Sequence, residues 1–367
     1  MLYCLELILL ISLILSTYET GYNDGTFPGV YIPNFADPNI TWEKLGTYNI
    51  GLDFAFLNNR ISGSIDYFNK NTFDLLGNIV LAPSTGITGI SSNIGSLRNS
   101  GVELSLLTKN IVKSDFYWET NFNFGTLKNR ITEQSQESVI VGSFRRAVGL
   151  PMYNFYIAEW AGVNPDNGLP QWYADEKDAD GKVTGKKIVN TYAAATRYDM
   201  GSALPTITGG LQNSMRYKDI DFSFLINFAL GGQILDADYI GLMSRAPSSG
   251  YQLSIDMLNR WQKPGDITDV PRVHTRQTDY GNPSTRHLVS GDYARLRNIT
   301  LGYTIPVQRL ISNDIIKQCR IFLQADNMLT WKKAPFSGLD PEVSINGLTD
   351  ARSTPFKTLT LGLNVRF

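Results

Sequence analysis

The residues that could carry out covalent chemistry gather in the stretch 274–292. This stretch holds both histidines of the chain, with serines and aspartates around them: His274, His287, Ser284, Ser290, Asp279 and Asp292. A serine, a histidine and an aspartate can form a nucleophilic triad when the fold brings them together. The sequence lacks the Gly-x-Ser-x-Gly turn that presents such a serine in many hydrolases. We therefore predict no catalytic residue and no enzymatic activity.

A second stretch has the spacing of a metal-binding loop. Glu176, Asp178 and Asp180 precede Gly181, as the first oxygen ligands and the glycine of an EF-hand loop do. The twelfth position of such a loop needs a bidentate glutamate, and here it is Lys187. The sequence therefore favours a solvated acidic turn over a calcium site.

Aromatic residues in the loops are candidates for ligand contact. Trp160, Trp172, Tyr173 and Trp261 could stack on sugar rings or could pack the loops together, and packing is the commoner role for any one of them. The two cysteines, Cys4 and Cys319, lie far apart, which disfavours a disulfide or a thiolate metal site. We predict no cofactor and no metal, and the sequence leaves the substrate-binding residues unassigned.

The elements that must position these residues follow a period of two. In the stretch 116–124, Phe116, Trp118, Phe122 and Phe124 alternate with polar or amphipathic residues, and about nine further segments show the same alternation. These segments are 46–57, 60–68, 101–109, 206–217, 220–230, 292–305, 318–328 and 359–367, with a weaker one at 153–162. The sequence therefore predicts an all-β protein of roughly ten antiparallel strands.

The predicted connections alternate in length. Short ones are expected at 58–59, 110–114, 218–219 and 306–317, and long ones at 71–100, 129–152, 231–290 and 328–355. Long loops are rare in compact soluble domains, whereas short periplasmic turns and long extracellular loops are typical of outer-membrane barrels. One connection, 163–205, breaks this rule, because strand parity places its forty or so residues on the periplasmic side.

A soluble β-sandwich also has alternating strands, so the two faces must be compared. Asn, Gly, Ser and Thr dominate the polar faces, as in a barrel lumen, and the apolar faces of the strongest strands carry no charge. Mean hydropathy is -0.14, which argues against a helical membrane protein but not against a barrel. Arg295 and Arg297 are expected to share a face with Ile299 and Leu301, near the extracellular end of their strand.

Several stretches resemble the SusC/RagA family of TonB-linked outer-membrane transporters. These are 37–76, "GVNPDNGLPQWY" at 162–173, "DYARLRNITLGYTIP" at 292–306, "RIFLQADNMLTW" at 320–331 and "GLDPEVS" at 338–344. Asn164 stands where the family has Asp. The resemblance covers roughly residues 22–367. It implies an antiparallel transmembrane β-barrel in the Gram-negative outer membrane, of which this chain would supply about the last ten of 22 strands.

The resemblance also implies a function and partners. Family members import glycans or oligopeptides with a SusD-like surface lipoprotein, driven by TonB. No plug domain or TonB box is found in the sequence, so contact with the TonB complex is expected only through a plug absent from this chain. Besides outer-membrane lipid and a glycan or peptide ligand, no partner is expected, and the net charge of -1 disfavours nucleic acid. The alternatives are a truncated, non-transporting fragment, a passive surface-binding β protein and a soluble β-sandwich adhesin.

The chain divides into two parts of unequal length. Residues 1–19 form an apolar segment about as long as the core of a signal peptide, without a basic start or a cleavage site. It could be a signal anchor, a degenerate signal peptide, or a segment not native to the domain that follows. Residues 20–367 are expected to form the C-terminal portion of the barrel.

Overall fold

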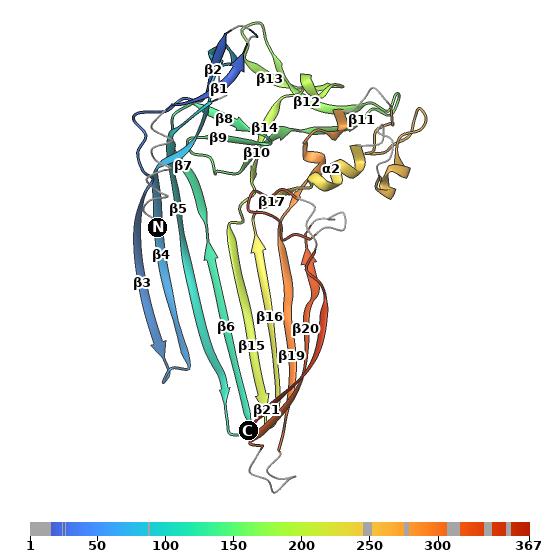
Figure 1. The fold of residues 1–367 in the computed structure, drawn as a ribbon. Helices are drawn as coiled ribbons and strands as arrows, with labels where there is room; N and C mark the ends of the chain where they lie inside the picture. The colour runs from blue at the N-terminus through green and yellow to red at the C-terminus, as the bar shows by residue number, and fades with distance from the viewer. Residues whose placement is uncertain are drawn as a thin grey trace.

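The computed structural model is built on one large antiparallel sheet (Figure 1). The structure describes residues 16–23, 25, 27–86, 89–244, 252–274, 279–306, 316–333, 340–349 and 354–367. The sheet has ten strands, nine of which follow one another from edge to edge in the order β21-β20-β19-β16-β15-β6-β5-β4-β3, while β7 pairs with β5. In chain order these are β3 (Lys44–Phe56), β4 (Ile61–Val80), β5 (Gly89–Val112), β6 (Phe116–Thr126), β7 (Lys128–Gln134), β15 (Ile207–Tyr217), β16 (Ile220–Leu230), β19 (Tyr293–Ile305), β20 (Gln318–Lys332) and β21 (Thr358–Arg366). We call this sheet the wall.

The two faces of the wall differ as the alternation predicts. Cross-strand partners such as Phe122 and Leu211 share one face, and Asn123 and Gly210 share the other. Among the described residues, no protein layer covers the apolar face, and its side chains are exposed, for example Leu52 at 64% and Leu361 at 72%. A soluble sheet buries its apolar face against a second layer. The wall is therefore a membrane-type sheet, and the expected all-β barrel architecture is confirmed.

The connections sort to the two ends of the wall as expected. The turns at 57–60, 113–115 and 218–219 lie at the turn end, at the bottom of Figure 1, where β19 also ends and β20 begins. Asn58, Asn59 and Lys218 adopt positive φ there, which asparagine tolerates well in two-residue hairpins. The described parts of the longer connections lie at the opposite end, called the loop end. Among the described residues, no helix is long and apolar enough to span a bilayer.

Two predicted boundaries are wrong. The expected loop 71–100 is mostly strand, because β4 and β5 continue past the other strands to Val80 and from Gly89. The expected weak strand at 153–162 is two short strands outside the wall, and β7 is the tenth strand instead. Residues 135–206 are therefore a single connection between β7 and β15 at the loop end, which removes the parity conflict at 163–205.

A β-bulge in β19 overturns the expected placement of Arg295 and Arg297. On β16, the neighbours Leu225 and Ile226 pair with Asn298 and Leu296, so Arg297 is an extra residue. An extra residue in one strand reverses its alternation beyond that point. Arg295 therefore pairs with Asn227 on the polar face and does not share the face of Ile299.

Small sheets and helices form a cap over the loop end. The cap strands are β8 (Ser138–Val141), β9 (Phe144–Ala147), β10 (Asn154–Ala158), β11 (Trp160–Val163), β12 (Pro170–Lys177), β13 (Val183–Val189), β14 (Arg197–Ser202), β17 (Gln233–Leu235) and β18 (Leu288–Ser290). They make three sheets, β14-β10-β9-β8, β11-β12-β13 and β17-β18. The cap helices are α2 (Ala237–Ser244) and the 3-10 helices η2 (Tyr192–Ala194), η3 (Ile255–Asn259), η4 (Asp279–Gly281) and η5 (Thr285–His287), and η1 (Pro83–Thr85) lies between β4 and β5.

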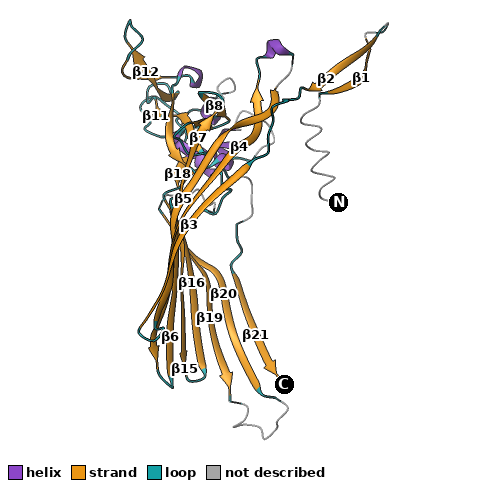
Figure 2. Ribbon diagram, turned by 90° about the vertical axis from the view of Figure 1, so that its left-hand side faces the viewer, coloured by secondary structure: helices purple, strands orange, loops and turns teal. Residues whose placement is uncertain are grey.

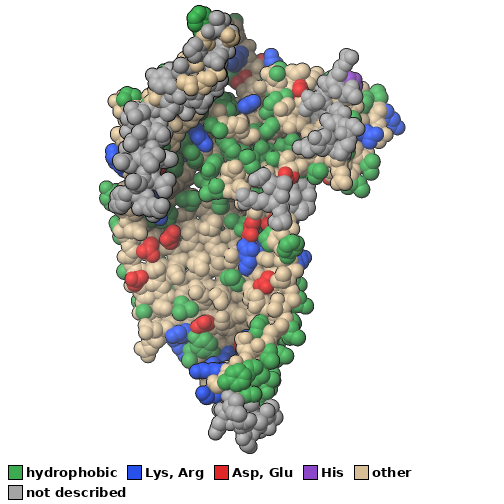
Figure 3. Space-filling model, viewed as in Figure 1, with side chains coloured by type: hydrophobic (Ala, Val, Ile, Leu, Met, Phe, Trp, Pro, Cys, Tyr) green, Lys and Arg blue, Asp and Glu red, His purple; other side chains and the backbone are tan. Residues whose placement is uncertain are grey.

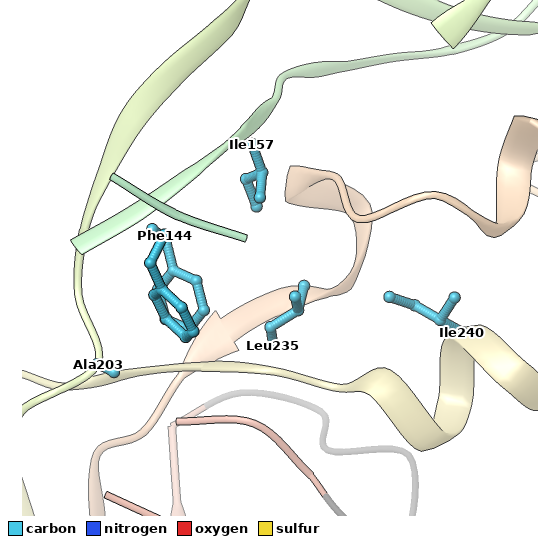
Figure 4. Packing of buried hydrophobic residues seen from close by; sticks show 6 residues of the cluster. Phe144, Ile157, Ala203, Leu235 and Ile240 are labelled. Atoms are coloured by element: carbon cyan, nitrogen blue, oxygen red, sulfur yellow. The ribbon is translucent and has the colours of Figure 1, made fainter. Parts of the chain in front are cut away.

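The buried core of the molecule lies in this cap. Phe144, Phe155, Ile157, Leu235 and Ile240 pack together from β9, β10, β17 and α2, as Figure 4 shows. Burial of these side chains joins segments that are far apart in sequence, since each apolar side chain removed from water contributes roughly 1.5–3 kcal/mol. The cap is thus held by its own hydrophobic core, separate from the wall.

The first described element is a separate hairpin of β1 (Thr17–Asn23) and β2 (Pro28–Asn34). It projects from the loop end on the side of β3, as Figure 2 shows. Residues 1–15, which include Cys4 and most of the apolar N-terminal segment, lie outside the described residues.

Candidate ligand-binding surface

The polar face of the wall is the first candidate surface. Viewed as in Figure 3, its lower half is mostly uncharged polar surface with scattered acidic and basic groups. A hollow of about 740 Å³ on this face is lined by residues of β4, β5, β6, β15, β16 and β19, among them Ser64, Asp66, Glu103, Asn123, Asn227 and Tyr293. Asp66 and Glu103 are direct cross-strand partners, so this part of the surface is acidic. Such a surface suits water and polar solutes.

An ion-pair network at the loop end of β19 joins the wall to the last long connection. Arg295 is 1% exposed and pairs with Asp340 and, at 3.2 Å, with Glu342. The other carboxylate oxygen of Glu342 accepts hydrogen bonds from Arg297 at 2.5 Å and from the Tyr293 hydroxyl at 3.1 Å. The network therefore fixes the segment 340–349 over the polar face. The sequence motif "GLDPEVS" does not by itself indicate this role, and the two arginines on an apparently apolar face were the available signal.

The histidine and serine candidates do not assemble into a triad. His287 is 2% exposed, its ring contacts the Tyr239 ring edge-on at 6.0 Å, and neither ring nitrogen has a hydrogen-bond partner in the described part of the chain. Burial, and then the neighbouring Arg286 charge, lowers the pKa of His287 to about 3. The residue is therefore a neutral core histidine.

The other members of that set have separate roles. The Asp292 carboxylate accepts a hydrogen bond from the Gly231 backbone N–H at 2.6 Å. The Asp279 carboxylate accepts one from the Tyr192 backbone N–H at 3.1 Å. The Ser290 hydroxyl accepts the Asp292 amide at 3.2 Å, Ser284 is buried ahead of η5, and His274 is exposed. The structure thus spreads these residues over turns of the cap.

The acidic stretch 176–187 is a β-hairpin with an exposed turn. β12 and β13 pair antiparallel, and the Asp178 carboxylate accepts the backbone N–H groups of Asp180 and Lys182 at 3.1 and 2.9 Å. Gly181 has φ +80° at the turn, a conformation that glycine adopts without strain. The glycine and the aspartates are therefore accounted for by turn geometry.

The loop aromatics pack against the loops. Trp172 is fully buried, with edge-on ring contacts to Trp160 at 5.5 Å and to Tyr192 at 5.7 Å. The Trp261 indole N–H donates to the Pro165 carbonyl at 2.9 Å. The Tyr173 ring lies 5.7 Å from the Lys186 ammonium. Packing of the cap is thus their observed role.

The stretch 162–173 forms the turn between β11 and β12 on which Trp261 rests. The Asn164 side-chain oxygen accepts the Asp166 amide at 2.8 Å, and the Asn164 carbonyl accepts the Gly168 amide at 2.8 Å. An aspartate carboxylate could accept the same amide. The Asn at this family position therefore preserves the turn.

A second candidate surface, which the sequence patterns do not indicate, is an apolar groove of about 370 Å³ at the loop end. It lies between the extensions of β4 and β5, the strand β7 and the hairpin of β8 and β9. The aliphatic residues that line this groove include Ile79, Ile94, Ile131, Val139 and Ile140. These positions belong to stretches expected to be loops, so no periodicity in the sequence marks the groove.

Fold and surfaces together define a class of protein: a membrane β-barrel wall with a polar interior and an elaborate cap. The family model described as "TonB dependent receptor-like, beta-barrel" matches residues 14–328, so the chain belongs to this family. Members of this family are outer-membrane proteins, which places the wall in the outer membrane.

Curated relatives support this family assignment. TonB-dependent receptor P3 of Formosa agariphila is 30% identical over 365 residues, which cover 92% of this chain and 36% of that protein. TonB-dependent receptor SusC of Bacteroides thetaiotaomicron is 29% identical over 354 residues, which cover 91% of this chain and 33% of that protein. The chain therefore spans about a third of the length of these relatives.

Solved structures of the RagAB peptide transporter have the same fold. One of them superposes with a TM-score of 0.80 at 25% identity, covering 96% of this chain and 38% of the RagAB chain. Another, of the RagAB peptide importer in the closed-closed state, has a TM-score of 0.79 at 25% identity. Chain and relatives thus share the wall and the cap.

Proposed function

We propose that residues 20–367 form the C-terminal barrel part of an outer-membrane nutrient importer of the SusC/RagA type. One observation carries the proposal: a predominantly apolar outer face backs a polar inner face across nine strands. The apolar face suits hydrocarbon, and the polar face suits a hydrated lumen. The titles of the RagAB peptide importer structures support import as the role.

The proposal includes a division of labour between wall and cap. The wall supplies part of the barrel, and the cap supplies part of the ligand cavity together with a SusD-like surface lipoprotein. Residues 1–19 are proposed to be separate from this barrel. The TonB complex supplies the energy for import, and the ligand is a glycan or an oligopeptide. Binding and positioning, without covalent chemistry, are all that such a role demands of these residues.

An uptake experiment tests the proposal against a passive surface-binding protein. Cells producing the protein are compared with cells from which the coding region for residues 44–367 has been removed. Each strain is given labelled oligopeptides or labelled maltooligosaccharides, with and without a protonophore. We expect accumulation that needs both the coding region and the proton gradient. Equal accumulation by the two strains, or retention of label under protonophore, would contradict energised import.

A further inference from the structure

Three cations lie close together where β5 and β7 pair, toward the loop end of the wall. Arg98 of β5 is the direct cross-strand partner of Arg130 of β7, and Lys128 pairs with Ser100 two positions along the same ladder. Direct partners point to the same face with Cβ atoms about 5 Å apart, and diagonal neighbours are about 7–8 Å apart. All three side chains are exposed. We call Arg98, Lys128 and Arg130 the basic cluster.

The strand register places the basic cluster on the apolar outer face. Arg98 shares its face with Val102, four residues along β5, and Val102 pairs with the exposed Tyr67 of β4. Ten positions of β4 separate Ile61, at the turn end, from Asn71, the cross-strand partner of Arg98. At about 3.3 Å per residue and a tilt of about 35–45°, this corresponds to a height of roughly 25 Å. The apolar band of an outer-membrane barrel is about 25 Å tall, so the cluster lies at the level of the lipid headgroups.

No acidic side chain pairs with the basic cluster in the described part of the chain. None of its members forms an ion pair there, whereas Lys44, on the same face of β3, pairs with Asp74 at 2.8 Å. On β7, the Glu133 carboxylate accepts the hydroxyl of the buried Ser96 at 2.9 Å. Like charges directly opposite each other on neighbouring strands destabilise a sheet. An anion held between the two arginines removes this repulsion.

We infer that the basic cluster binds a phosphate group of lipid A, the membrane-embedded part of lipopolysaccharide. The inference rests on the proposed function in one respect: it takes the loop end to face outward, as long loops of outer-membrane barrels do, so that lipopolysaccharide is the facing lipid. An arginine guanidinium presents a planar fork of N–H donors that matches phosphate, and its charge-assisted hydrogen bonds are about twice as strong as neutral ones. The Arg98 Nε–H donates to the Asn71 side-chain oxygen at 2.8 Å, which positions the guanidinium on the outer face.

Position and charge favour lipid A over the other anions. The apolar surface that includes Val102 and Tyr67 continues from the cluster toward the turn end, so a bound lipid can lay its acyl chains there, which a soluble acidic partner lacks. A phosphomonoester, as in lipid A, carries nearly two negative charges at neutral pH, and the phosphodiester of a glycerophospholipid carries one. Three cations on two neighbouring cross-strand pairs match the higher charge.

The test follows the heat stability of the protein, purified in detergent from outer membranes and washed free of lipopolysaccharide. Lipid A, enzymatically dephosphorylated lipid A and phosphatidylglycerol are added in turn. A ligand that binds only the folded state raises the temperature at which the folded gel band is lost. We expect lipid A to raise it, dephosphorylated lipid A to leave it unchanged, and phosphatidylglycerol to need at least tenfold more lipid for the same shift. No shift with lipid A, or an equal shift with either other lipid, would overturn the inference.

Two double variants locate the site. Arg98→Gln with Arg130→Gln should weaken lipid A binding about 100-fold, since each lost hydrogen bond to a charged group costs about a factor of ten. Without lipid, this variant should be at least as heat-stable as the unaltered protein, because the like-charge pair is gone. The control Lys70→Gln with Lys109→Gln removes the same charge from the polar face of β4 and β5 and should bind lipid A normally. Equal lipid A binding by the two variants, or a lipid-free arginine variant of lower stability, would assign the arginines another role.

The outcome can be separated from that of the import proposal. Lipid binding in detergent needs no proton gradient, and the uptake experiment does not depend on which lipid contacts the wall. Energised uptake without a phosphate-dependent lipid A shift refutes only the lipid site. A lipid A shift without energised uptake refutes only the importer. If the arginine variant fails to fold, the comparison of the three lipids on the unaltered protein still decides.

Discussion

Arg295 is the charged residue whose burial has the largest consequence for the cap. Its side chain holds Asp340 and Glu342 over the polar face, and only 1% of it is exposed. Breaking a buried ion pair by removing one partner costs about 3–5 kcal/mol, because the remaining charge is left without compensation. The position of segment 340–349 therefore depends on one guanidinium.

We predict that Arg295→Met releases this segment. Limited trypsin digestion of outer-membrane vesicles, read at Lys333, should be roughly 100-fold faster if about 3 kcal/mol of local stability is lost. Arg297→Met should have a smaller effect, since Arg297 is 33% exposed and bonds to Glu342 alone among the carboxylates of the described residues. Lys44→Met, which removes an exposed pair with Asp74, should have none. Cleavage of Arg295→Met at the rate of the unaltered chain would refute the role of Arg295 in holding segment 340–349.

His287 makes the cap sensitive to acid. Burial lowers the pKa of its folded form to about 3, against an ordinary value of 6.5. The unfolded cap therefore binds a proton that the folded cap does not at any pH between these values. The stabilising contribution is complete above about pH 6.5 and falls as the pH falls toward 3.

The expected effect is a drop in local stability of up to about 1.4 kcal/mol per pH unit below pH 6.5. Hydrogen exchange of peptides covering 233–244 and 285–290, corrected for the intrinsic rate, measures it. The variant His287→Leu should lose most of this pH dependence, and His274→Leu, at an exposed position, should keep it. An identical pH dependence in all three proteins would show that His287 is not the group that titrates.

At the scale of elements, phenylalanine rings cover glycines of neighbouring strands. The direct cross-strand pairs Phe54–Gly63, Phe68–Gly101, Phe228–Gly209 and Phe322–Gly362 all have this form. A Cβ on Gly209 would lie 2.5 Å from the Phe228 ring and closer still to the Asn123 carbonyl. An aromatic ring over a strand glycine protects the backbone and pins the register of the two strands.

Gly209→Ala should therefore destabilise the wall. We expect a loss of about 1–3 kcal/mol, typical of overpacking, seen as a lower temperature at which the folded gel band disappears. Gly125→Ala is the matched control on the neighbouring strand β6, because its Cβ would meet only the Glu103 side chain at 3.6 Å. Equal melting of the two variants would show that the Phe228 ring moves aside freely.

The elements that could be predicted from the sequence are those with a periodic environment. The alternation from Phe116 to Phe124 reports lipid on one side and water on the other, so β6 was recognisable from sequence. The β19 bulge was not, because an extra residue leaves the local composition unchanged and shows only in the pairing with β16. The cap strands are short and pack on a core with no repeating geometry, so the groove near Ile140 left no periodic trace.

For the whole molecule, the decisive property is that the apolar outer face contacts lipid. An arginine on the lipid face near the bilayer midplane costs about 2–4 kcal/mol, whereas a lumen position tolerates it. Phe122→Arg should therefore reduce the amount of folded protein recovered from outer membranes, and Asn123→Arg, one residue along β6, should not. If both variants assemble equally, the outer face does not lie in hydrocarbon.

Spin labels give the same information without a charge. A label at Phe122 or Leu361 should be relaxed by oxygen dissolved in the bilayer, and a label at Asn123 by water-soluble reagents. The contrast follows from the pairing of Phe122 with Leu211 and of Leu361 with Leu323 on one face. Protection of Phe122 and Leu361 from both reagents would favour a soluble sandwich, whose apolar faces pack against each other.

The extra residue at position 297 also bears on how β19 can change during evolution. Its two halves obey opposite in–out rules, and Arg297 is the residue that reconciles them. Deleting Arg297 alone would leave Leu296 and Asn298 as neighbours opposite Ile226 and Leu225, so the ladder with β16 would become regular and Arg295 would stay on the polar face. A gap of a single position in an alignment there should therefore mark a protein that has lost the bulge and the Arg297 contact with Glu342 but has kept the anchor of its last loop.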